Sequence, residues 1–393
     1  MRILHVLSER GYSGGEEQLA RLLEHLVVAG HDSVLVLNPG ARFEATCKDL
    51  GLPVHRVRMR NDADVIAIAR LRKMFKVLRP DLIHFACSRG HKLGAFAARL
   101  TKSAPPTVVT RRMDYPLGRG RFRRWLYGTA VDGVVAVSEG VRREVLAIGV
   151  PESHVRCIHD GVDFERFAGL QRSPLRQRTR QELGCGVQCP DETTVIGLTT
   201  ASLHRRKGQD VLLDALGQLG QATDAFPGLR LVWLFAGDGP ERATLEARAT
   251  TLGLCRLEDE EPRVSVRFLG SVRPVDPLLA AADLFCLPSR KEGLGVALLE
   301  AMAAGIAVIG SAVGGMLEVI EHERSGLLVP VEDAHGIARS IASLLSADER
   351  RKIGDAARDR VCAEFTIERM CRATEAYYRE LIARVQASRA ECR

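Results

Sequence analysis

The chain has 393 residues, of which 46% are hydrophobic, and its 56 Lys and Arg exceed its 49 Asp and Glu to give a net charge of +7. This length is too great for one ordinary core and the composition is that of a globular protein, so we expect two folded domains rather than a disordered chain. No apolar run reaches the roughly 18–20 residues that cross a bilayer, and the first residues look like a strand rather than a signal peptide, which indicates a cytoplasmic protein.

Positive charge is concentrated in the first half of the chain. Residues 1–180 contain 31 Lys and Arg against 18 Asp and Glu, a net charge of +13, whereas residues 181–393 contain 25 and 31, a net charge of −6. A basic field of this kind attracts a polyanion: nucleic acid, an anionic membrane surface or a phosphorylated substrate.

The ten cysteines are scattered, and only Cys185 and Cys189 lie close together. Because no second pair and no His cluster accompanies them, we expect no zinc site. Isolated cysteines in apolar surroundings, such as Cys286, are interpreted as small core residues in a reducing compartment.

The first half alternates short apolar runs with helical patterns. The strand-like runs are Ile3–Leu7, Val34–Leu37, Val54–Val57, Leu82–Phe85, Val108–Thr110, Val134–Val137 and Val155–Ile158. Apolar residues recur at helical spacing in Glu17–Ala29, Asp64–Leu78, Lys92–Leu100 and Gly140–Ala147. This alternation predicts a parallel sheet with helices on both faces.

The alternation restarts after a polar, Arg-rich stretch that has no convincing period. The next strand-like runs are Val195–Leu198, Leu231–Ala236, Val264–Leu269, Leu284–Leu287, Val308–Ile309 and Leu327–Val329. The helical patterns are Asp210–Leu219, Glu241–Leu252, Val296–Ala304, Ala334–Leu345 and Glu349–Phe365, and Arg256–Arg263 is a charged insertion. A last helical pattern, Ile367–Val385, has no strand after it, so we expect it to pack back on the first domain.

The sequence therefore predicts an α/β protein of two doubly wound, Rossmann-like parallel-sheet domains that face a cleft. The expected divisions are residues 1–175, a linker at 176–192, a second domain at 193–366 and a returning helix at 367–393. Ligands in such sheets bind beyond the carboxyl ends of the strands, and each candidate site below follows a predicted strand.

Two carboxylates lie on either side of a glycine turn in the second domain. Glu292 falls in the loop after Leu284–Leu287, and Glu300 falls about one turn into the following helix. Carboxylates accept hydrogen bonds from hydroxyls, and a helix N-terminus offers backbone N–H groups to an anion, so a nucleotide sugar suits this segment. A solvated surface pair is the alternative, although the helix around Glu300 is apolar on most sides.

Three other loops can bind an anion. Lys207, with Arg205 and Arg206 beside it, can place a cation against a diphosphate, or it belongs to an exposed basic loop. Gly14 and Gly15 precede a helix and allow close approach of a ligand, or they form a plain tight turn. Gly237 begins a Gly-Asp-Gly-Pro turn, for which a structural role is the stronger interpretation.

A basic and aromatic segment follows the strand that ends at Thr110. Arg119, Arg121, Arg123 and Arg124 surround Phe122, Trp125 and Tyr127. This mixture suits a membrane interface or a nucleic-acid surface, and a solvated helix face is the alternative.

These motifs together resemble glycosyltransferase family 4, the retaining enzymes with the GT-B fold, over nearly the whole chain. The resemblance rests on Gly14–Ala20, Gly30-His31, Asp81–His84, Val137–Arg142, His159–Asp163, Lys207-Gly208, Gly237–Pro240, Phe268–Gly270, Pro288–Gly293, Glu300–Gly305, Gly314-Gly315 and Glu318. The acid pair with seven residues between its members is the most specific of these motifs.

The resemblance implies a role for each matched position. Glu300 would hold the ribose hydroxyls of the donor nucleotide, and Glu292 would contact hydroxyls of the transferred sugar. Lys207 would stabilise the departing diphosphate, and Arg205 or Arg206 is the candidate to replace an Arg that many members carry about five residues before this Lys. The remaining donor contacts would come from Gly14, Gly15, Gly237, Gly270, Gly293, Leu294 and Gly295. No metal and no cofactor is implied, because cations and backbone dipoles can neutralise the leaving group.

The sequence departs from the family pattern at three places. Ala201 and Ser202 stand where many members carry an Arg, and Ala86 stands where many carry a second His. Arg111–Asp114 replaces a common His, so Asp114 or Arg112 is the candidate to orient the acceptor and act on the acceptor side.

The resulting prediction is a metal-independent, retaining glycosyltransferase that moves a sugar from a nucleotide-diphosphate-sugar to a hydroxyl of a glycan or glycolipid. The basic first half favours an anionic acceptor at the inner face of a membrane, as in lipopolysaccharide synthesis, and peripheral attachment there. Two alternatives remain open: a basic module that binds nucleic acid or membrane on a degenerate fold, and a nucleotide-sugar epimerase. Under the transferase prediction no nucleic acid partner is expected.

Overall fold

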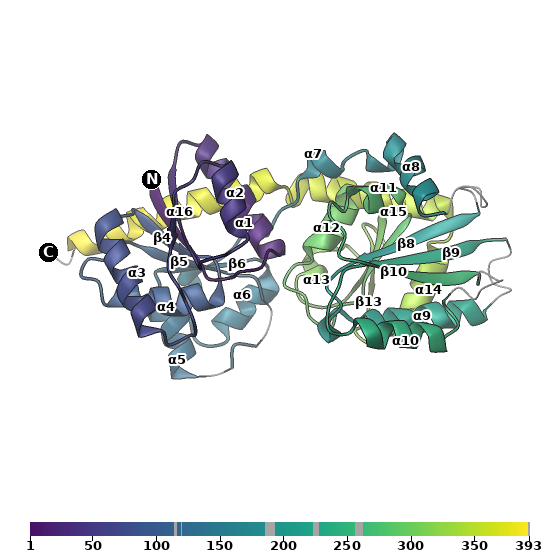
Figure 1. The fold of residues 1–393 in the computed structure, drawn as a ribbon, viewed down its shortest axis with the longest axis horizontal. Coiled ribbons are helices and arrows are strands. Elements are labelled where there is room, and N and C mark those ends of the chain that lie inside the picture. Colours follow the sequence, from purple (N-terminus) through teal and green to yellow (C-terminus); the bar gives the residue numbers. More distant parts are fainter. Residues whose placement is uncertain (114–115, 119, 185–192, 223–227, 256–261, 392–393) are drawn as a thin grey trace. The chain divides into compact units, whose positions relative to one another are not determined.

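The structure is a computed structural model that describes residues 1–113, 116–118, 120–184, 193–222, 228–255 and 262–391. The chain forms two compact units (Figure 1). Unit 1 contains Met1–Gly161 and Ile367–Arg393, and unit 2 contains Val162–Thr366.

Unit 1 is built on a parallel sheet of seven strands in the order β3-β2-β1-β4-β5-β6-β7. The strands are β1 (Arg2–Leu7), β2 (Asp32–Leu37), β3 (Val54–Arg56), β4 (Leu82–Phe85), β5 (Thr107–Arg111), β6 (Gly133–Ala136) and β7 (Val155–Cys157). The helices are α1 (Gly14–Val28), α2 (Phe43–Asp49), α3 (Val65–Leu78), α4 (Ser88–Arg99), α5 (Arg121–Arg124) with the π-helical turn η1 (Trp125–Thr129), α6 (Glu139–Leu146) and α16 (Ile367–Glu391).

The last helix of the chain completes the core of unit 1. Helix α16 packs against α1, and its buried Tyr378 and Leu381 join Leu22 and Leu26 in one apolar cluster. On the opposite face of the sheet α3 packs against α4 (Figure 1). The acid Glu375 of α16 accepts hydrogen bonds from His25 at 2.8 Å and His31 at 2.9 Å, so polar contacts also hold this helix to unit 1.

Unit 2 is built on a second parallel sheet, of six strands in the order β10-β9-β8-β11-β12-β13. The strands are β8 (Thr194–Thr200), β9 (Arg230–Ala236), β10 (Val264–Gly270), β11 (Leu284–Leu287), β12 (Ala307–Ser311) and β13 (Leu327–Val329). The helices are α7 (Phe164–Phe167), α8 (Pro174–Glu182), α9 (Gln209–Gln221), α10 (Arg242–Thr251), α11 (Asp276–Ala281), α12 (Val296–Ala303), α13 (Met316–Val319), α14 (Ala334–Ser343) and α15 (Ala347–Glu364).

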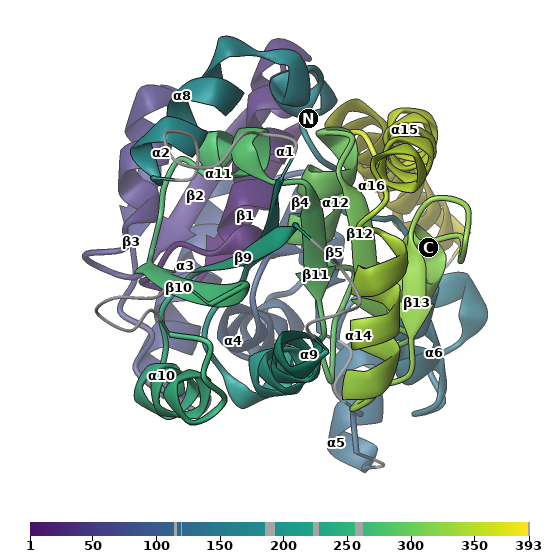
Figure 2. The same cartoon turned by 90° about the vertical axis from the view of Figure 1, so that its right-hand side faces the viewer.

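Helices cover both faces of this second sheet. Helix α9 packs with α10 and α14 on one face, and α12 packs with α15 on the other (Figure 2). The strands between them are buried on both sides, which explains why they read as continuous apolar runs rather than as alternating patterns. The α/β class and the two doubly wound parallel sheets are therefore confirmed.

The boundary between the two units differs from the predicted one. Residues 162–175 were expected in the first domain, and 176–192 were expected to be a linker, but residues 162–184 belong to unit 2. Arg166 forms a bidentate pair with Asp276 at 2.7 and 2.8 Å, and Gln171 donates to the Leu279 carbonyl at 2.6 Å. Residues 185–192 lie outside the described part of the chain, as do residues 256–261 of the charged insertion.

A buried ion pair explains why the Arg-rich stretch is not a linker. Arg180 of α8 is 1% exposed and reaches Asp283 at 3.0 Å and the Thr194 carbonyl at 2.7 Å. Arg176 bonds the other oxygen of Asp283 at 2.6 Å. The polar composition of this helix therefore serves an internal charge network rather than solvation.

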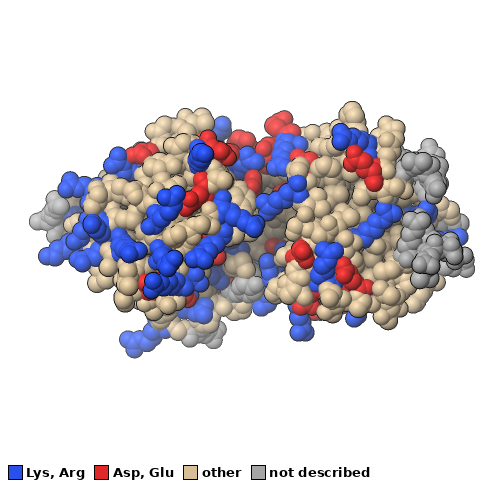
Figure 3. Space-filling view, viewed as in Figure 1, with Lys and Arg blue, Asp and Glu red and all other residues tan. Residues whose placement is uncertain are grey.

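On the face of the molecule that Figure 3 shows, surface charge follows the asymmetry of the sequence. Figure 3 shows Lys and Arg gathered over unit 1, including the region of α3 that Figure 1 labels. None of the helices in the described residues is long and apolar enough to cross a membrane.

The anchoring of α8 leads to a stability prediction. Replacing Arg180 by Ala leaves the buried Asp283 with one fewer cation, and we expect a loss of about 3 kcal/mol in the free energy of unfolding of unit 2. Arg178 on the same helix is the matched control, because its pair with Glu182 is exposed, and Arg178→Ala should cost less than about 1 kcal/mol. Urea denaturation followed by Trp233 fluorescence in a Trp125→Phe background measures both variants, and equal losses would contradict the burial argument.

Candidate functional site

In the sheet of unit 2 the chain proceeds from β8 toward one edge, through β9 and β10, and from β11 toward the other edge, through β12 and β13. The position between β8 and β11 is therefore called the reversal point. Strands β8 and β11 are neighbours, but β8 leads to α9 on one face and β11 leads to α12 on the other. The loops that follow them, residues 201–208 and 288–295, therefore lie next to each other at the carboxyl edge of the sheet and lead to helices on opposite faces. This is the place where open parallel sheets bind ligands.

An ion pair joins these two loops. The Lys207 Nζ lies 2.5 Å from the Glu292 Oε2, and each side chain is only 12% exposed. Ser289 Oγ donates to the same carboxylate oxygen at 3.1 Å. Lys207 and Glu292, which the sequence singled out separately, are thus in direct contact. The hydrogen bond from Ser289 to Glu292 was not predicted.

The two loops also touch through their backbones. Gly208 has a φ of +68°, and a Cβ at this position would lie 2.0 Å from the Pro288 carbonyl oxygen. The Arg290 amide donates to the Arg206 carbonyl at 2.8 Å. Only glycine permits this approach after Lys207, which gives a physical reason for the Lys-Gly sequence.

The loop after β11 presents backbone amides at the start of α12. Gly293, Leu294 and Gly295 are buried, and Gly295, with a φ of +96°, caps the helix. Within the described residues, no acceptor is found for the amides of these three residues. Amides arranged in this way at a helix N-terminus bind anions.

The second predicted acid lies on the same helix. Glu300 is half-buried in α12, one turn beyond Val296, and α12 is otherwise almost entirely apolar. The next loop of the sheet supports the turn, because a Cβ on Gly315 would lie 2.4 Å from the Gly293 carbonyl oxygen.

Gly237 and Gly270 meet each other and pack against the loop after β8. The Gly237 amide donates to the Gly270 carbonyl at 2.7 Å, and a Cβ on Gly237 would lie 1.8 Å from the Ala201 carbonyl oxygen. Close packing against the loop after β8 therefore explains why this turn contains glycine, as the structural interpretation expected. Residues Arg205–Lys207 form one turn of 3-10 helix, called the Lys207 turn below. Arg206 is half-buried in this turn, and its carbonyl accepts a hydrogen bond from the Arg290 amide.

Unit 1 has an equivalent reversal point between β1 and β4. Gly14 and Gly15 begin α1 after the N-cap Ser13, whose side chain and amide both bond Glu16. A Cβ on Gly14 would meet nothing within 4 Å, so this turn is open to a ligand. The glycines are therefore not explained by close internal packing.

Arg112 fills the space beside Gly15. Its Cδ would lie 3.6 Å from a Cβ on Gly15, and its Nε lies 3.3 Å from both carboxylate oxygens of Asp160. Burial raises the pKa of the Asp160 carboxyl, and the Arg112 guanidinium opposes that shift. The other acceptor-side candidate, Asp114, lies outside the described residues.

His84 belongs to the core of unit 1. Its Nδ1 lies 3.1 Å from His5 Nδ1, and its Nε2 lies 2.8 Å from Thr110 Oγ1. Both imidazoles are fully buried, and burial lowers the pKa of His5 to about 3 and that of His84 well below its usual range. These neutral rings bridge β4 to its two neighbouring strands.

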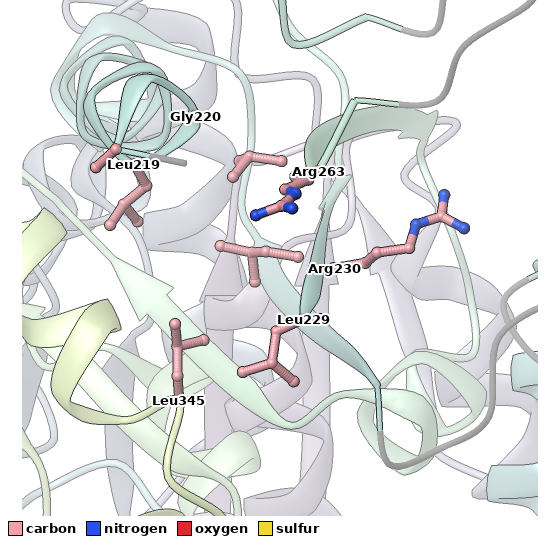
Figure 4. Close-up of a pocket in the computed structure, with 9 residues that line it drawn as sticks. Leu219, Gly220, Leu229, Arg230, Arg263 and Leu345 are labelled. Carbon is pink, nitrogen blue, oxygen red and sulfur yellow. The ribbon is translucent and has the colours of Figure 1, made fainter. Parts of the chain in front are cut away.

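An apolar pocket lies at the opposite edge of the second sheet (Figure 4). It is lined by Leu219, Leu231 and Leu345, with Arg230 and Arg263 at the amino ends of β9 and β10. Lys207 and Glu292 follow carboxyl ends of strands, so this pocket is not part of their site.

Models of glycosyltransferase families match the sequences of both units. A family model described as Glycosyltransferase Family 4 matches residues 12–166, and one described as Glycosyl transferases group 1 matches residues 194–347. The two matches together span most of the chain.

Relatives of known function are similar to either part or all of the chain. An N-acetyl-alpha-D-glucosaminyl L-malate synthase of Bacillus anthracis is 30% identical over 252 residues, which are 64% of this chain and 60% of that protein. The chain thus spans about three fifths of the length of this relative. The lipopolysaccharide core biosynthesis glycosyltransferase LpsE of Rhizobium meliloti is 25% identical over 95% of this chain and 97% of its own length.

Solved structures share the fold. The Anabaena protein Alr3699/HepE in complex with UDP and glucose has a TM-score of 0.80 and 21% identity, and the match covers 97% of this chain and all of that one. This likeness over nearly the whole chain, together with the two parallel sheets, supports the GT-B fold that the sequence resemblance implied.

The close backbone approach at Gly208 leads to a second prediction. Gly208→Ala should push the Lys207 turn away from Pro288, lengthen the Lys207–Glu292 contact and accelerate amide hydrogen exchange in residues 288–295. Gly253→Ala is the matched control, because Gly253 has a similar φ of +69° but nothing within 4 Å of a Cβ. Both variants should carry about 1–2 kcal/mol of backbone strain. Unchanged exchange in Gly208→Ala would contradict the role of the backbone contact.

Proposed function

Because the chain belongs to glycosyltransferase family 4, we propose that it transfers a sugar from a nucleotide-diphosphate-sugar to a hydroxyl of a glycan or glycolipid, with retention of the anomeric configuration. The observation that carries the proposal is the Lys207–Glu292 pair, held at the reversal point of the second sheet beside the amides that begin α12. A cation, a carboxylate and oriented amides are the groups that a diphosphate linked to a sugar requires.

Leaving-group stabilisation is the main catalytic term in this proposal. As the bond between the sugar and the diphosphate breaks, the electron pair stays on the diphosphate oxygen, and negative charge grows there. Lys207 Nζ, assisted by Arg206 and the amides of Gly293–Gly295, would stabilise that charge. Because these groups supply the neutralisation, the reaction needs no metal and no cofactor.

Glu292 has two tasks in the proposed cycle. In the structure it holds the Lys207 ammonium in place at 2.5 Å. When the diphosphate takes over that ammonium, the Glu292 carboxylate is released to accept hydrogen bonds from hydroxyls of the transferred sugar. Glu300 of α12 is assigned to the ribose hydroxyls of the nucleotide. Gly14, Gly15, Gly237 and Gly270 are assigned to the remaining donor contacts.

The acceptor side is assigned to unit 1. Arg112, fixed by the buried Asp160, would orient an anionic acceptor, and Asp114, which lies outside the described residues, is the other candidate for the acceptor side. The full-length similarity to LpsE, a lipopolysaccharide core glycosyltransferase, supports an envelope glycan or glycolipid as the acceptor class.

A lipid-linked acceptor would be met at a membrane, and α3 offers a surface for it. Val65 and Val77 of α3 are 73% and 69% exposed, among exposed cations that include Arg70 and Lys73, and α3 contains no acid. Cations interspersed with exposed apolar side chains favour an anionic lipid surface. The basic and aromatic segment adds Phe122, which is 49% exposed between Arg121 and Arg123. We therefore propose peripheral attachment to the cytoplasmic face of a membrane.

The ribose assignment leads to a binding prediction. Glu300→Ala should weaken binding of the donor nucleotide at least tenfold, because the ribose hydroxyls lose a charged acceptor. Isothermal titration calorimetry measures the affinity, after a thermal-shift screen has identified the nucleotide sugar that binds the wild type. Glu246→Ala, which removes a Glu of α10 that pairs with Arg242, is the control and should bind as the wild type does. Unchanged affinity in Glu300→Ala would refute the assignment.

The membrane proposal predicts a salt-sensitive partition. The wild type should sediment with vesicles that contain anionic lipid and should leave them at high salt. The double variant Arg70→Glu, Lys73→Glu should partition at least tenfold less, at about 1 kcal/mol for each cation lost. Arg351→Glu, Lys352→Glu on α15 makes the same charge change on unit 2 and is the control. Equal partition onto neutral vesicles would overturn the electrostatic account.

A further inference from the structure

Arg290 connects the two loops of the candidate site to a third segment. It lies two residues before Glu292, in the loop after β11. Its guanidinium contacts Asp210 at the start of α9, the carbonyl of Arg205 in the Lys207 turn, and Glu332 just before α14.

Every N–H group of this guanidinium has an acceptor. Nη1 donates to Asp210 Oδ1 at 2.8 Å and to the Arg205 carbonyl at 2.6 Å. Nη2 donates to Asp210 Oδ2 at 2.7 Å and to Glu332 Oε2 at 2.9 Å, and Nε donates to Glu332 Oε1. An arginine has five such donors, so its capacity is fully used. Because the carboxylates of Asp210 and Glu332 both bind this cation, the Arg290 side chain links parts of unit 2 to one another.

The network is partly shielded and specific to arginine. The Arg290 side chain is 19% exposed, against 40% for Asp210 and 56% for Glu332. Hydrogen bonds from Arg290 lower the pKa of Glu332, and they also lower that of Asp210 against the opposing effect of burial. Lysine has three donors from one nitrogen and cannot form two bidentate pairs and a carbonyl contact together.

We propose that Arg290 is a positioning residue that fixes the distance between Lys207 and Glu292. This inference rests on the proposed function, because it assigns those two residues to one donor site. The Arg290 guanidinium holds the Lys207 turn through the Arg205 carbonyl, and it holds its own loop, which carries Glu292, to Asp210 of α9 and to Glu332 just before α14. The Arg290 backbone amide adds a bond to the Arg206 carbonyl that substitution of the side chain leaves in place. The distance between the cation and the acid is thereby set before a ligand arrives, as pre-organised catalysis requires.

Unit 2 contains a matched control pair. Arg248 of α10 binds Asp214 with two contacts at 2.6 and 2.8 Å, and Asp214 lies one turn after Asp210 on the same helix α9. This pair has the same bidentate geometry as Arg290 with Asp210, but it contacts neither loop of the site. Loss of either pair should affect stability, and only loss of the Arg290 network should affect the site.

The kinetic test compares Arg290→Ala and Arg290→Lys with Arg248→Ala and Arg248→Lys. We expect both Arg290 variants to lower kcat/KM for the donor at least thirtyfold, and both Arg248 variants to stay within twofold of the wild type, while Tm falls less in Arg248→Ala because that pair is more exposed. In a Glu292→Gln background we expect Arg290→Ala to lower kcat/KM by less than a further threefold, because Arg290 acts through Glu292. Wild-type kinetics in Arg290→Lys, or independent effects in the double variant, would overturn the proposal.

A second measurement needs no donor and separates this inference from the proposed function. Amide hydrogen exchange of the ligand-free protein should accelerate at least tenfold in residues 204–208 and 288–295 of both Arg290 variants, and not in the Arg248 variants. If the wild type binds no nucleotide sugar, the proposed function fails and the exchange result still decides the positioning role. Unchanged exchange in both loops would refute that role.

Discussion

The ion pair between Lys207 and Glu292 is the contact on which the candidate site depends. Its two members lie 85 positions apart in sequence and come together only because β8 and β11 are neighbours in a parallel sheet. At 12% exposure each, the two charges are shielded enough for their attraction to fix a geometry, yet they remain accessible to a ligand. A diphosphate that binds the Lys207 ammonium would release the Glu292 carboxylate. The carboxylate would then be able to accept hydrogen bonds from the sugar.

Close backbone approaches around the pair make the site rigid. Gly208 against Pro288, Gly237 against Ala201 and Gly315 against Gly293 leave no space for a side chain. The loops after β8, β9, β11 and β12 are therefore packed on one another at the carboxyl edge of the sheet. Arg290 adds a charge network to this packing. Gly208, Gly237 and Gly315 thus have a structural explanation that is independent of any contact with a ligand, whereas Gly14 and Gly15 do not.

Much of this arrangement could be predicted from the sequence. Apolar runs identified the strands, since a strand buried on both faces has a continuous apolar sequence. The loop that carries Glu292 followed from the strand and helix around it. The contacts of residues 162–184 with unit 2 could not be read from the sequence, because Arg166 binds Asp276 and Arg180 binds Asp283, each about a hundred residues away. The contacts of Arg290 are equally long-range, and the local sequence of a basic loop does not distinguish a bound cation from a solvated one.

The most direct test of the account is a crystal structure of the protein with a bound nucleoside diphosphate, chosen as the one that most raises the thermal stability. The account predicts a diphosphate oxygen within hydrogen-bond distance of Lys207 Nζ and of the amides that begin α12, with Glu292 no longer paired to Lys207. A diphosphate bound elsewhere, with the Lys207–Glu292 pair intact at about 2.5 Å, would contradict it.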